Sequence, residues 1–435
     1  MMKEDYSEYI KEQTDIIRNK INGMQRDITD REALEIIEEQ IFATYGNINL
    51  SLKDIRQIIR DIYIKLRCKL GVIQELVDNE LINEIMVNGA EKIFIEKGGK
   101  LVICDEQFES TEELEEVIRT IAAGVHREIN EMNPIVDARL EDGSRVNGVY
   151  KNIALNGPIL TIRKFGKTRI TMKDLMRAGS MSEDCASMLK TLVAAGYNIF
   201  VSGGTSSGKT TFLNALSEFI PKGERVIVIE DSAELQMKHI DNLVQMECHN
   251  ANSLGQGSVS MDMLIKTSLR MRPDRIIVGE VRGKEVSDML QAMNTGHDGS
   301  MSTGHGNSVS GMLRRIEAMY LMSAKIPIDA IRAQIVEGID IMVHLGRTSD
   351  GRRMVMEVAE LLDYCDDKYI LSTLFARDEN MNMYCTGNKL VNTNKLRYRG
   401  IKDDRLQFLH RVKEGKNNLH PSDNRFDSDN VQCVL

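Results

Sequence analysis

The sequence predicts an α/β protein in which a parallel-sheet domain follows a smaller α+β domain and an N-terminal helical arm. Beyond about residue 172, apolar strands alternate with helical stretches, which is typical of a mostly parallel sheet. A glycine-rich loop at 203–210 follows the first of these strands and precedes a helix. Upstream, residues 72–162 instead contain short apolar runs separated by turn residues. The strands predicted for the parallel sheet are 199–202, 225–229, 275–278 and 340–345.

The N-terminal segment is charged and favours helix. Two interpretations of its apolar stripe remain open. It is either a docking element for a partner or the face of a helix that packs on the next domain. The residues of this stripe recur at three- and four-residue steps, as on one face of a helix: Ile55, Ile58, Ile59, Ile62 and Leu66.

Changes in composition and in the pattern of apolar and turn residues predict the domain boundaries. The turn signals Asn88-Gly89 and Gly98-Gly99 flank short strands, and a helical pattern at 112–128 is expected to cover one face of their sheet. A short basic, glycine-containing segment has the character of a hinge between domains. The polar end of the chain is expected to be disordered. The predicted divisions are a helical arm at 1–70, an α+β domain at 71–163, a hinge at 164–171, an α/β domain at 172–363 and an irregular tail at 364–435.

Composition excludes several classes of protein. The 435 residues carry a formal net charge of -9, include no Trp and are 5% aromatic, so a nucleic-acid partner is not expected. No apolar run approaches the roughly 20 residues that cross a bilayer, so we expect a cytoplasmic protein. The seven cysteines form no C-x-x-C pair, which argues against a zinc site.

The loop at 203–210 reads Gly-Gly-Thr-Ser-Ser-Gly-Lys-Thr and fits the phosphate-binding pattern G-x-x-x-x-G-K-T. In this pattern backbone N–H groups surround phosphate oxygens at the positive end of the following helix. Lys209 is expected to bridge the β- and γ-phosphates, and the Thr210 hydroxyl to ligate Mg²⁺. No Asn-Lys-x-Asp guanine motif follows, which favours ATP as the nucleotide. The predicted nucleotide-binding residues are Gly203, Gly204, Thr205, Ser206, Ser207, Gly208, Lys209, Thr210 and Thr211.

Carboxylates follow two apolar strands of the predicted parallel sheet. Glu230 and Glu234 come directly after the strand at 225–229, and Glu280 follows the strand at 275–278. The carboxyl ends of parallel strands line the ligand crevice, although a solvated turn is the alternative for the first pair. Glu280 is our first candidate to orient the attacking water or to hold Mg²⁺ through water, and Glu230 is the second.

Two histidines, His297 and His305, lie in neighbouring glycine-containing segments. A zinc site would need a third ligand, and none has suitable spacing. We expect a γ-phosphate sensor, and the alternative is a glycine-rich turn with incidental histidines. An arginine from outside the loop could neutralise charge on the transferring phosphoryl group, although a surface ion pair is the ordinary role for any single one. The candidate arginines are Arg139, Arg145 and Arg163 upstream of the loop and Arg270, Arg272 and Arg282 downstream.

Together these motifs resemble those of the secretion ATPase superfamily, the GspE/PilT-like ATPases of type II secretion, type IV pili and type IV secretion. They look closest to its CpaF-type branch, which serves tight-adherence pili. The resemblance covers about residues 52–363. Ser206 replaces a glycine common in this loop, and a proline often found in the first acidic segment is absent. The matching segments are 84–89, 136–140, 142–147, 203–210, 272–283 and 294–300.

The resemblance implies a RecA-like domain hinged to the α+β domain and a homo-oligomer, expected to be a hexameric ring. It makes Glu230 and Glu234 the acidic box and Glu280 the Walker B glutamate. It likewise makes His297 and His305 the histidine box. In such rings, arginines that align with Arg145 and Arg163 reach the γ-phosphate from the first domain.

The leading functional hypothesis is therefore a ring motor in which ATP hydrolysis drives hinge motion and moves an inner-membrane platform protein of a pilus or secretion system. Association with the membrane would be peripheral and through that partner. A nucleic-acid translocase with a RecA-like core is the alternative. A nucleotide-gated scaffold that barely hydrolyses ATP is a third possibility.

Overall fold

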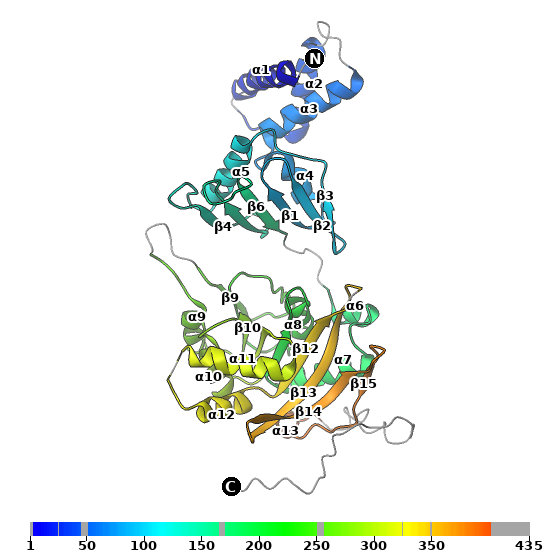
Figure 1. The fold of residues 1–435 in the computed structure, drawn as a ribbon, viewed down its shortest axis with the longest axis vertical. Coiled ribbons are helices and arrows are strands. Elements are labelled where there is room, and N and C mark those ends of the chain that lie inside the picture. Colours follow the sequence, from blue (N-terminus) through cyan, green and yellow to red (C-terminus); the bar gives the residue numbers. More distant parts are fainter. Residues whose placement is uncertain are drawn as a thin grey trace. The chain divides into compact units, whose positions relative to one another are not determined.

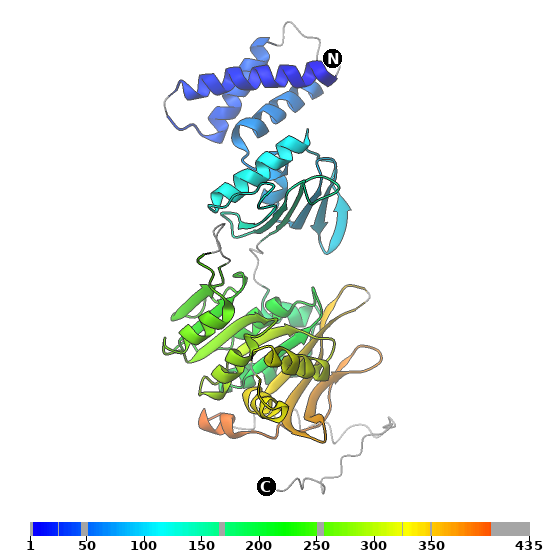
Figure 2. The same ribbon diagram turned by 60° about the vertical axis from the view of Figure 1, so that its left-hand side comes forward.

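The computed structural model describes residues 3–24, 26–44, 51–164, 170–249, 256–323, 325–348 and 350–401. The chain forms two compact units that divide between Thr168 and Arg169 (Figures 1 and 2). The hinge predicted at 164–171 falls at this division, but residues 165–169 lie outside the described residues. Among the helices of the described ranges, none is both long and apolar enough to cross a membrane.

The first unit begins with three helices: α1 (Lys3–Asn22), α2 (Asp30–Thr44) and α3 (Leu52–Arg67). Ser51 and Asp54 form a reciprocal capping box that fixes the start of α3. The predicted apolar stripe lies on α3, and its residues Ile55, Ile58 and Ile62 are fully buried against apolar side chains of α1 and α2. The stripe is therefore covered by the two preceding helices, and its fully buried residues are not available to a partner.

The rest of the first unit is an α+β fold. Six antiparallel strands lie in the order β3-β2-β1-β6-β5-β4, and α5 (Thr111–Gly124) covers one face (Figure 2). Ile118 of α5 approaches the sheet at Gly148, where a β-carbon would lie 2.8 Å from the Ile118 side chain. The remaining elements are η2 (Gly71–Ile73), α4 (Gln74–Asp78), β1 (Ile82–Asn88), β2 (Ile93–Lys97), β3 (Lys100–Ile103), β4 (Ile135–Arg139), β5 (Arg145–Val149) and β6 (Ile159–Arg163).

The second unit is built on a nine-stranded sheet in the order β15-β14-β13-β12-β7-β11-β10-β8-β9. The six strands from β12 to β9 are parallel, whereas β13, β14 and β15 extend the sheet by antiparallel pairing. The four predicted strands are present as β7 (Ile199–Gly203), β8 (Val226–Glu230), β10 (Arg275–Val281) and β12 (Ile341–Arg347). The sequence did not predict β9 (Leu243–Glu247) or β11 (Met301–His305).

Helices cover both faces of this sheet. One apolar core joins the sheet to α7 and α8, and a second joins the opposite face to α9, α10, α11 and α12. This layering buries both faces of the central strands, and all five residues of β7 are buried. The helices are α6 (Met172–Arg177), α7 (Glu183–Ala195), α8 (Lys209–Ser217), α9 (Met261–Ser268), α10 (Val286–Asn294), α11 (Val309–Leu321) and α12 (Ile328–Gly338).

The prediction of irregular chain beyond Asp363 is wrong for the part that the structure describes. β13 (Arg353–Cys365) and β14 (Lys368–Arg377) form a long hairpin, followed by β15 (Met383–Cys385) and α13 (Asn394–Tyr398). The turn of this hairpin contains Asp366 and Asp367, which have φ of 48° and 57°. The polar end expected to be disordered, residues 402–435, lies outside the described residues.

A buried ion pair lies at the start of β10. The Arg275 side chain is 0% exposed and contacts the Glu224 carboxylate, which is 9% exposed. Arg275 also donates to the carbonyl of Val193, and Arg399 adds a second cation 3.0 Å from Glu224. A buried charge that keeps such partners is tolerated, and one that loses them is not.

Replacement of Glu224 by alanine should therefore lower the free energy of unfolding by about 3 kcal/mol, because it leaves the Arg275 guanidinium buried without its carboxylate. The matched control is Arg399→Ala. It removes the partly exposed cation from the same carboxylate and should change stability by less than about 1 kcal/mol. Urea denaturation measures both. Equal effects of the two substitutions would contradict this interpretation.

Candidate functional site

The loop at 203–210 has the predicted context, with the buried strand β7 before it and α8 after it. Gly203 is tightly enclosed, since a β-carbon there would lie 2.5 Å from the Ser207 hydroxyl and 2.7 Å from the Leu345 carbonyl. Gly208 has φ of 90° and Ser206 has φ of 57°. No side chain caps the start of α8 at Gly208. The N–H groups of the first turn of α8 therefore face the loop as donors for an anion.

The ammonium group of Lys209 is enclosed by the loop. The residue is 7% exposed, and its Nζ donates to the carbonyls of Gly203 and Gly204 at 3.3 and 3.0 Å. Burial lowers the pKa of Lys209, and the negative charge of Glu280 opposes this shift. The third contact of this ammonium is the ring of His305. The ammonium is thus held by neutral groups.

His305 joins Lys209 to Glu280. It ends β11 beside β7, and its Nδ1 lies 3.3 Å from Lys209 Nζ. Because an ammonium can only donate, Nδ1 accepts and the ring proton is assigned to Nε2. Nε2 lies 2.8 Å from Glu280 Oε1, and Arg282 donates to Glu280 Oε2 at 3.1 Å. Lysine, histidine, glutamate and arginine thus form one continuous polar row at the carboxyl edge of the sheet.

Two shielded oxygens near this row lack hydrogen bonds. The Ser207 hydroxyl has no hydrogen-bond partner, and Glu280 Oε1, although close to His305 Nε2, has none with acceptable geometry. Buried polar atoms are nearly always satisfied in folded proteins, so unsatisfied ones call for an explanation. Among the described residues, no group of three His, Cys, Asp or Glu side chains could hold a metal by itself.

Glu230 and Glu234 have different surroundings from Glu280. Glu230 is 4% exposed, and its Oε1 accepts from the backbone N–H groups of Glu234 and Leu235 at 2.9 and 3.1 Å. A β-carbon on Gly279 would lie 2.9 Å from Glu230 Cγ, so this glycine lets the two acidic segments meet. Glu230 therefore fixes the loop that follows β8, whereas Glu280 lies 2.8 Å from His305 Nε2.

The structure does not bring His297 to this row. His297 precedes β11, and His305 is the last residue of this strand. The two histidines therefore lie at opposite ends of β11. His297 Nδ1 lies 3.1 Å from the carbonyl of Ala292, at the end of α10. Of the two candidate sensor histidines, His305 therefore lies beside Lys209 and Glu280, and His297 does not.

Arg145 and Arg163 belong to the first unit, so their approach to the loop stays a prediction. They are directly opposed across β5 and β6, and Arg139 is opposed to Arg145 across β4 and β5. Opposed residues of neighbouring strands point to the same face of a sheet. The three candidate arginines of the first unit therefore form a row across one face of its sheet.

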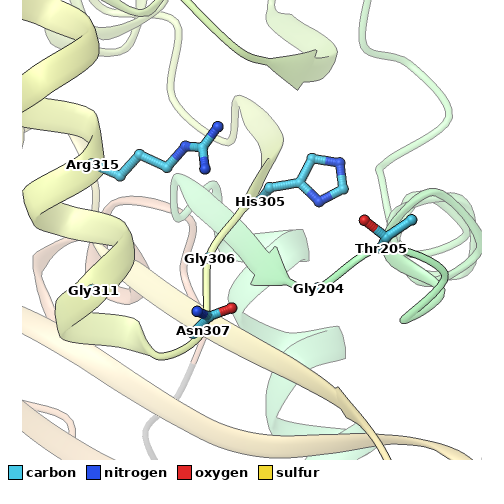
Figure 3. A pocket seen from close by; sticks show the side chains of 7 residues that line it. All are labelled: Gly204, Thr205, His305, Gly306, Asn307, Gly311 and Arg315. Atoms are coloured by element: carbon cyan, nitrogen blue, oxygen red, sulfur yellow. The ribbon is translucent and has the colours of Figure 1, made fainter.

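A pocket of about 510 Å³ lies beside the loop (Figure 3), and its lining includes the polar side chains of Asn307 and Arg315, which were not among the predicted site residues. Arg315 is exposed on α11, and its side chain extends from the helix toward the segment that carries His305. Gly311 and Arg315 are four residues apart on α11, so both face the pocket. No local motif in the sequence marks Arg315, because it lines the pocket through its position on α11. The complete lining is Gly204, Thr205, His305, Gly306, Asn307, Gly311 and Arg315.

Comparison with known proteins identifies the family of this chain. Residues 67–385 match the family described as Type II/IV secretion system protein. The chain belongs to this family. An uncharacterized protein of Methanocaldococcus jannaschii is 37% identical over 296 residues, which cover 66% of this chain and 41% of that protein. The chain thus spans less than half the length of this relative. The probable conjugal transfer protein TrbB of Sinorhizobium fredii is 33% identical over 297 residues, covering 67% and 87% respectively.

A solved structure with the same fold is the Yersinia pseudotuberculosis ATPase DotB. The TM-score is 0.50 at 19% identity, and the match covers 70% of this chain and 80% of that chain. The predicted fold class is confirmed: a RecA-like α/β domain preceded by a smaller α+β domain. The assignment to the CpaF-type branch stays a prediction, since the comparisons identify the wider family.

The surroundings of His305 predict its titration. Burial and the charge of Lys209 lower its pKa below the ordinary 6.5, and Glu280 opposes them. A lowered histidine pKa means that protonation is harder in the folded state, so this contribution to stability is complete above pH 6.5 and declines as the pH falls below it. Titration of the ring C2–H signals by NMR, assigned by loss of the signal in His305→Gln, should give a pKa below 6.5.

Lys209→Met should raise this pKa by removing the neighbouring cation, and Glu280→Gln should lower it further. A His305 pKa above 6.5 in the unchanged protein, or a fall of this pKa in Lys209→Met and a rise in Glu280→Gln, would contradict the proposed row.

Proposed function

We propose that this chain binds ATP with Mg²⁺ and hydrolyses it to drive mechanical work in pilus assembly or secretion. The observation that carries the proposal is the row of Lys209, His305 and Glu280 beside the phosphate loop. Phosphoryl transfer depends mainly on positioning and on stabilisation of charge, and these three side chains supply both at one edge of the sheet.

Binding would begin at the loop. The N–H groups at the start of α8 and the Lys209 ammonium would receive the β- and γ-phosphates. The unsatisfied Ser207 hydroxyl lies within the same loop. Thr210 and Glu280 would hold Mg²⁺ together with the phosphates, Glu280 through water. When bound, the metal supplies positive charge that neutralises the phosphate oxygens.

Glu280 would orient the water that attacks the γ-phosphorus. The new bond joins the water oxygen to phosphorus, the bond from phosphorus to the bridging β,γ oxygen breaks, and the water proton passes to the Glu280 carboxylate. The neutral ring of His305 contacts both Lys209 and Glu280. Loss of the γ-phosphate beside Lys209 would therefore change the contact between His305 and Glu280. This contact is suited to a γ-phosphate sensor.

The assembly would be a hexameric ring of this chain, with Arg145 and Arg163 reaching the γ-phosphate from the first unit. Hinge motion between the units would move an inner-membrane platform protein, through which the ring associates with the membrane. The family match and the division of the chain at Thr168 support this part of the proposal. Within the family, the sequence motifs favour the CpaF-type branch for tight-adherence pili.

Turnover of Mg-ATP by the purified chain tests the proposal. Glu280→Gln keeps the size of the side chain but cannot take the water proton, so we expect kcat to fall by about 10²–10⁴-fold. Glu337→Gln, on the exposed side of α12, is the matched control and should leave kcat unchanged. Phosphate release at saturating Mg-ATP measures both.

Absence of turnover in the unchanged protein, with nucleotide bound, would favour a nucleotide-gated scaffold. Turnover that DNA stimulates, with an affinity for DNA that falls steeply with salt, would favour a nucleic-acid translocase. Either result would contradict the proposed motor, as would equal kcat values for Glu280→Gln and the control.

A further inference from the structure

Arg353 lies against the phosphate loop, although it comes from a distant part of the sequence. It is the first residue of β13, and its Nε donates to the carbonyl of Ser206 at 3.1 Å. Its aliphatic part lies alongside Gly208, where a β-carbon would be 3.3 Å from Arg353 Cδ. The side chain thus contacts both loop residues that have positive φ.

Ser206 adopts a conformation that its residue type disfavours. Its φ of 57° lies in the left-handed region, which glycine adopts readily and a residue with a β-carbon does not. Such a conformation persists only where surrounding contacts hold it. The hydrogen bond from Arg353 to the Ser206 carbonyl is a charge-assisted contact of this kind.

The strand that carries Arg353 is itself fixed. The Arg353 carbonyl accepts from the Ser180 hydroxyl at 2.7 Å, and the Val355 N–H donates to the Ser180 carbonyl at 2.9 Å. β13 is also paired with β12, in which Arg347 is opposed to Arg353. The guanidinium group therefore projects from a rigid base, and it can hold the loop rather than follow it.

We propose that Arg353 is a positioning residue that holds Ser206, and with it the phosphate loop, in the conformation that binds the nucleotide phosphates. It acts through the loop backbone and does not contact the ligand. The inference rests on the proposed binding of ATP, but not on hydrolysis. It also gives the antiparallel hairpin of β13 a role at the site, although this hairpin carries none of the predicted site residues.

The neighbouring arginine provides a matched control. Arg352 immediately precedes β13 and has the same charge, but its Nε donates to Asp350 at 2.7 Å and not to the loop. Replacement of Arg352 by alanine removes one cation from this region without removing the contact to Ser206. A general effect of charge would appear in both variants, whereas an effect of the contact would appear only in Arg353→Ala.

The experiment measures the Kd of Mg-ADP by calorimetry for the full chain and its variants. Arg353→Ala should weaken binding about ten-fold, the order expected for loss of one charge-assisted hydrogen bond. Arg352→Ala should bind as the unchanged protein does. The double variant Ser206→Gly with Arg353→Ala should recover most of the lost affinity, because glycine adopts the required conformation without support. In turnover assays, Arg353→Ala should raise KM for ATP and leave kcat unchanged.

Equal affinity of Arg353→Ala and the unchanged protein would overturn the inference and leave the proposed function standing. Failure of Ser206→Gly to restore affinity would also overturn it, because Arg353 would then act on the ligand directly. If the unchanged protein binds Mg-ADP but does not hydrolyse ATP, the proposed function fails, and the affinities of the variants still decide the role of Arg353.

Discussion

A buried ammonium group is the constraint on which the candidate site depends. Lys209 is 7% exposed, and its contacts are two loop carbonyls and the ring of His305. A cation removed from water is unfavourable unless polar groups or an anion replace the lost hydration. The carbonyls replace part of it, and burial still lowers the pKa of Lys209. The remaining requirement is for negative charge, which a triphosphate at the loop would supply.

The topology of the sheet brings the other groups to this ammonium. β7, β8, β10 and β11 are parallel, so the loop, Glu230, Glu280 and His305 all lie at the same edge. Close packing between strands makes this convergence tight. Gly279 leaves space for Glu230, and Gly203 leaves space for Leu345 of β12. The antiparallel hairpin then supports the loop from outside through Arg353. The chemistry of the site thus depends on strand order more than on any single motif.

The sequence predicted the parts of the site that depend on local pattern. The strand, loop and helix around Lys209 were recognisable because apolar residues, glycines and a helix follow one another directly. Glu280 was recognisable because it follows an apolar strand. β11 was missed because its residues 301–305 do not form an apolar run, so the strand that separates His297 from His305 was not expected. The long β13–β14 hairpin was not predicted, since the chain beyond Asp363 was expected to be irregular.

Other features depend on tertiary packing and could not be read from local pattern. Arg315 lines the pocket because α11 packs on β11, where Met312 approaches Gly304, and Arg353 contacts the loop because β13 pairs with β12. Neither relation is encoded within a short window of sequence. The position of Glu230 after a strand was predicted correctly. The hydrogen bonds that its carboxylate accepts from the N–H groups of Glu234 and Leu235 could not be predicted from the sequence.

Thermal unfolding of Lys209→Met, with and without Mg-ATP, tests the central claim most directly. Methionine fills a similar volume without charge, so the variant should unfold at the same or a higher temperature than the unchanged protein when no nucleotide is present. Mg-ATP should raise the Tm of the unchanged protein, as a ligand specific to the folded state does, and leave that of the variant unchanged. A lower Tm of the variant without nucleotide, or equal stabilisation of both proteins by Mg-ATP, would contradict this account.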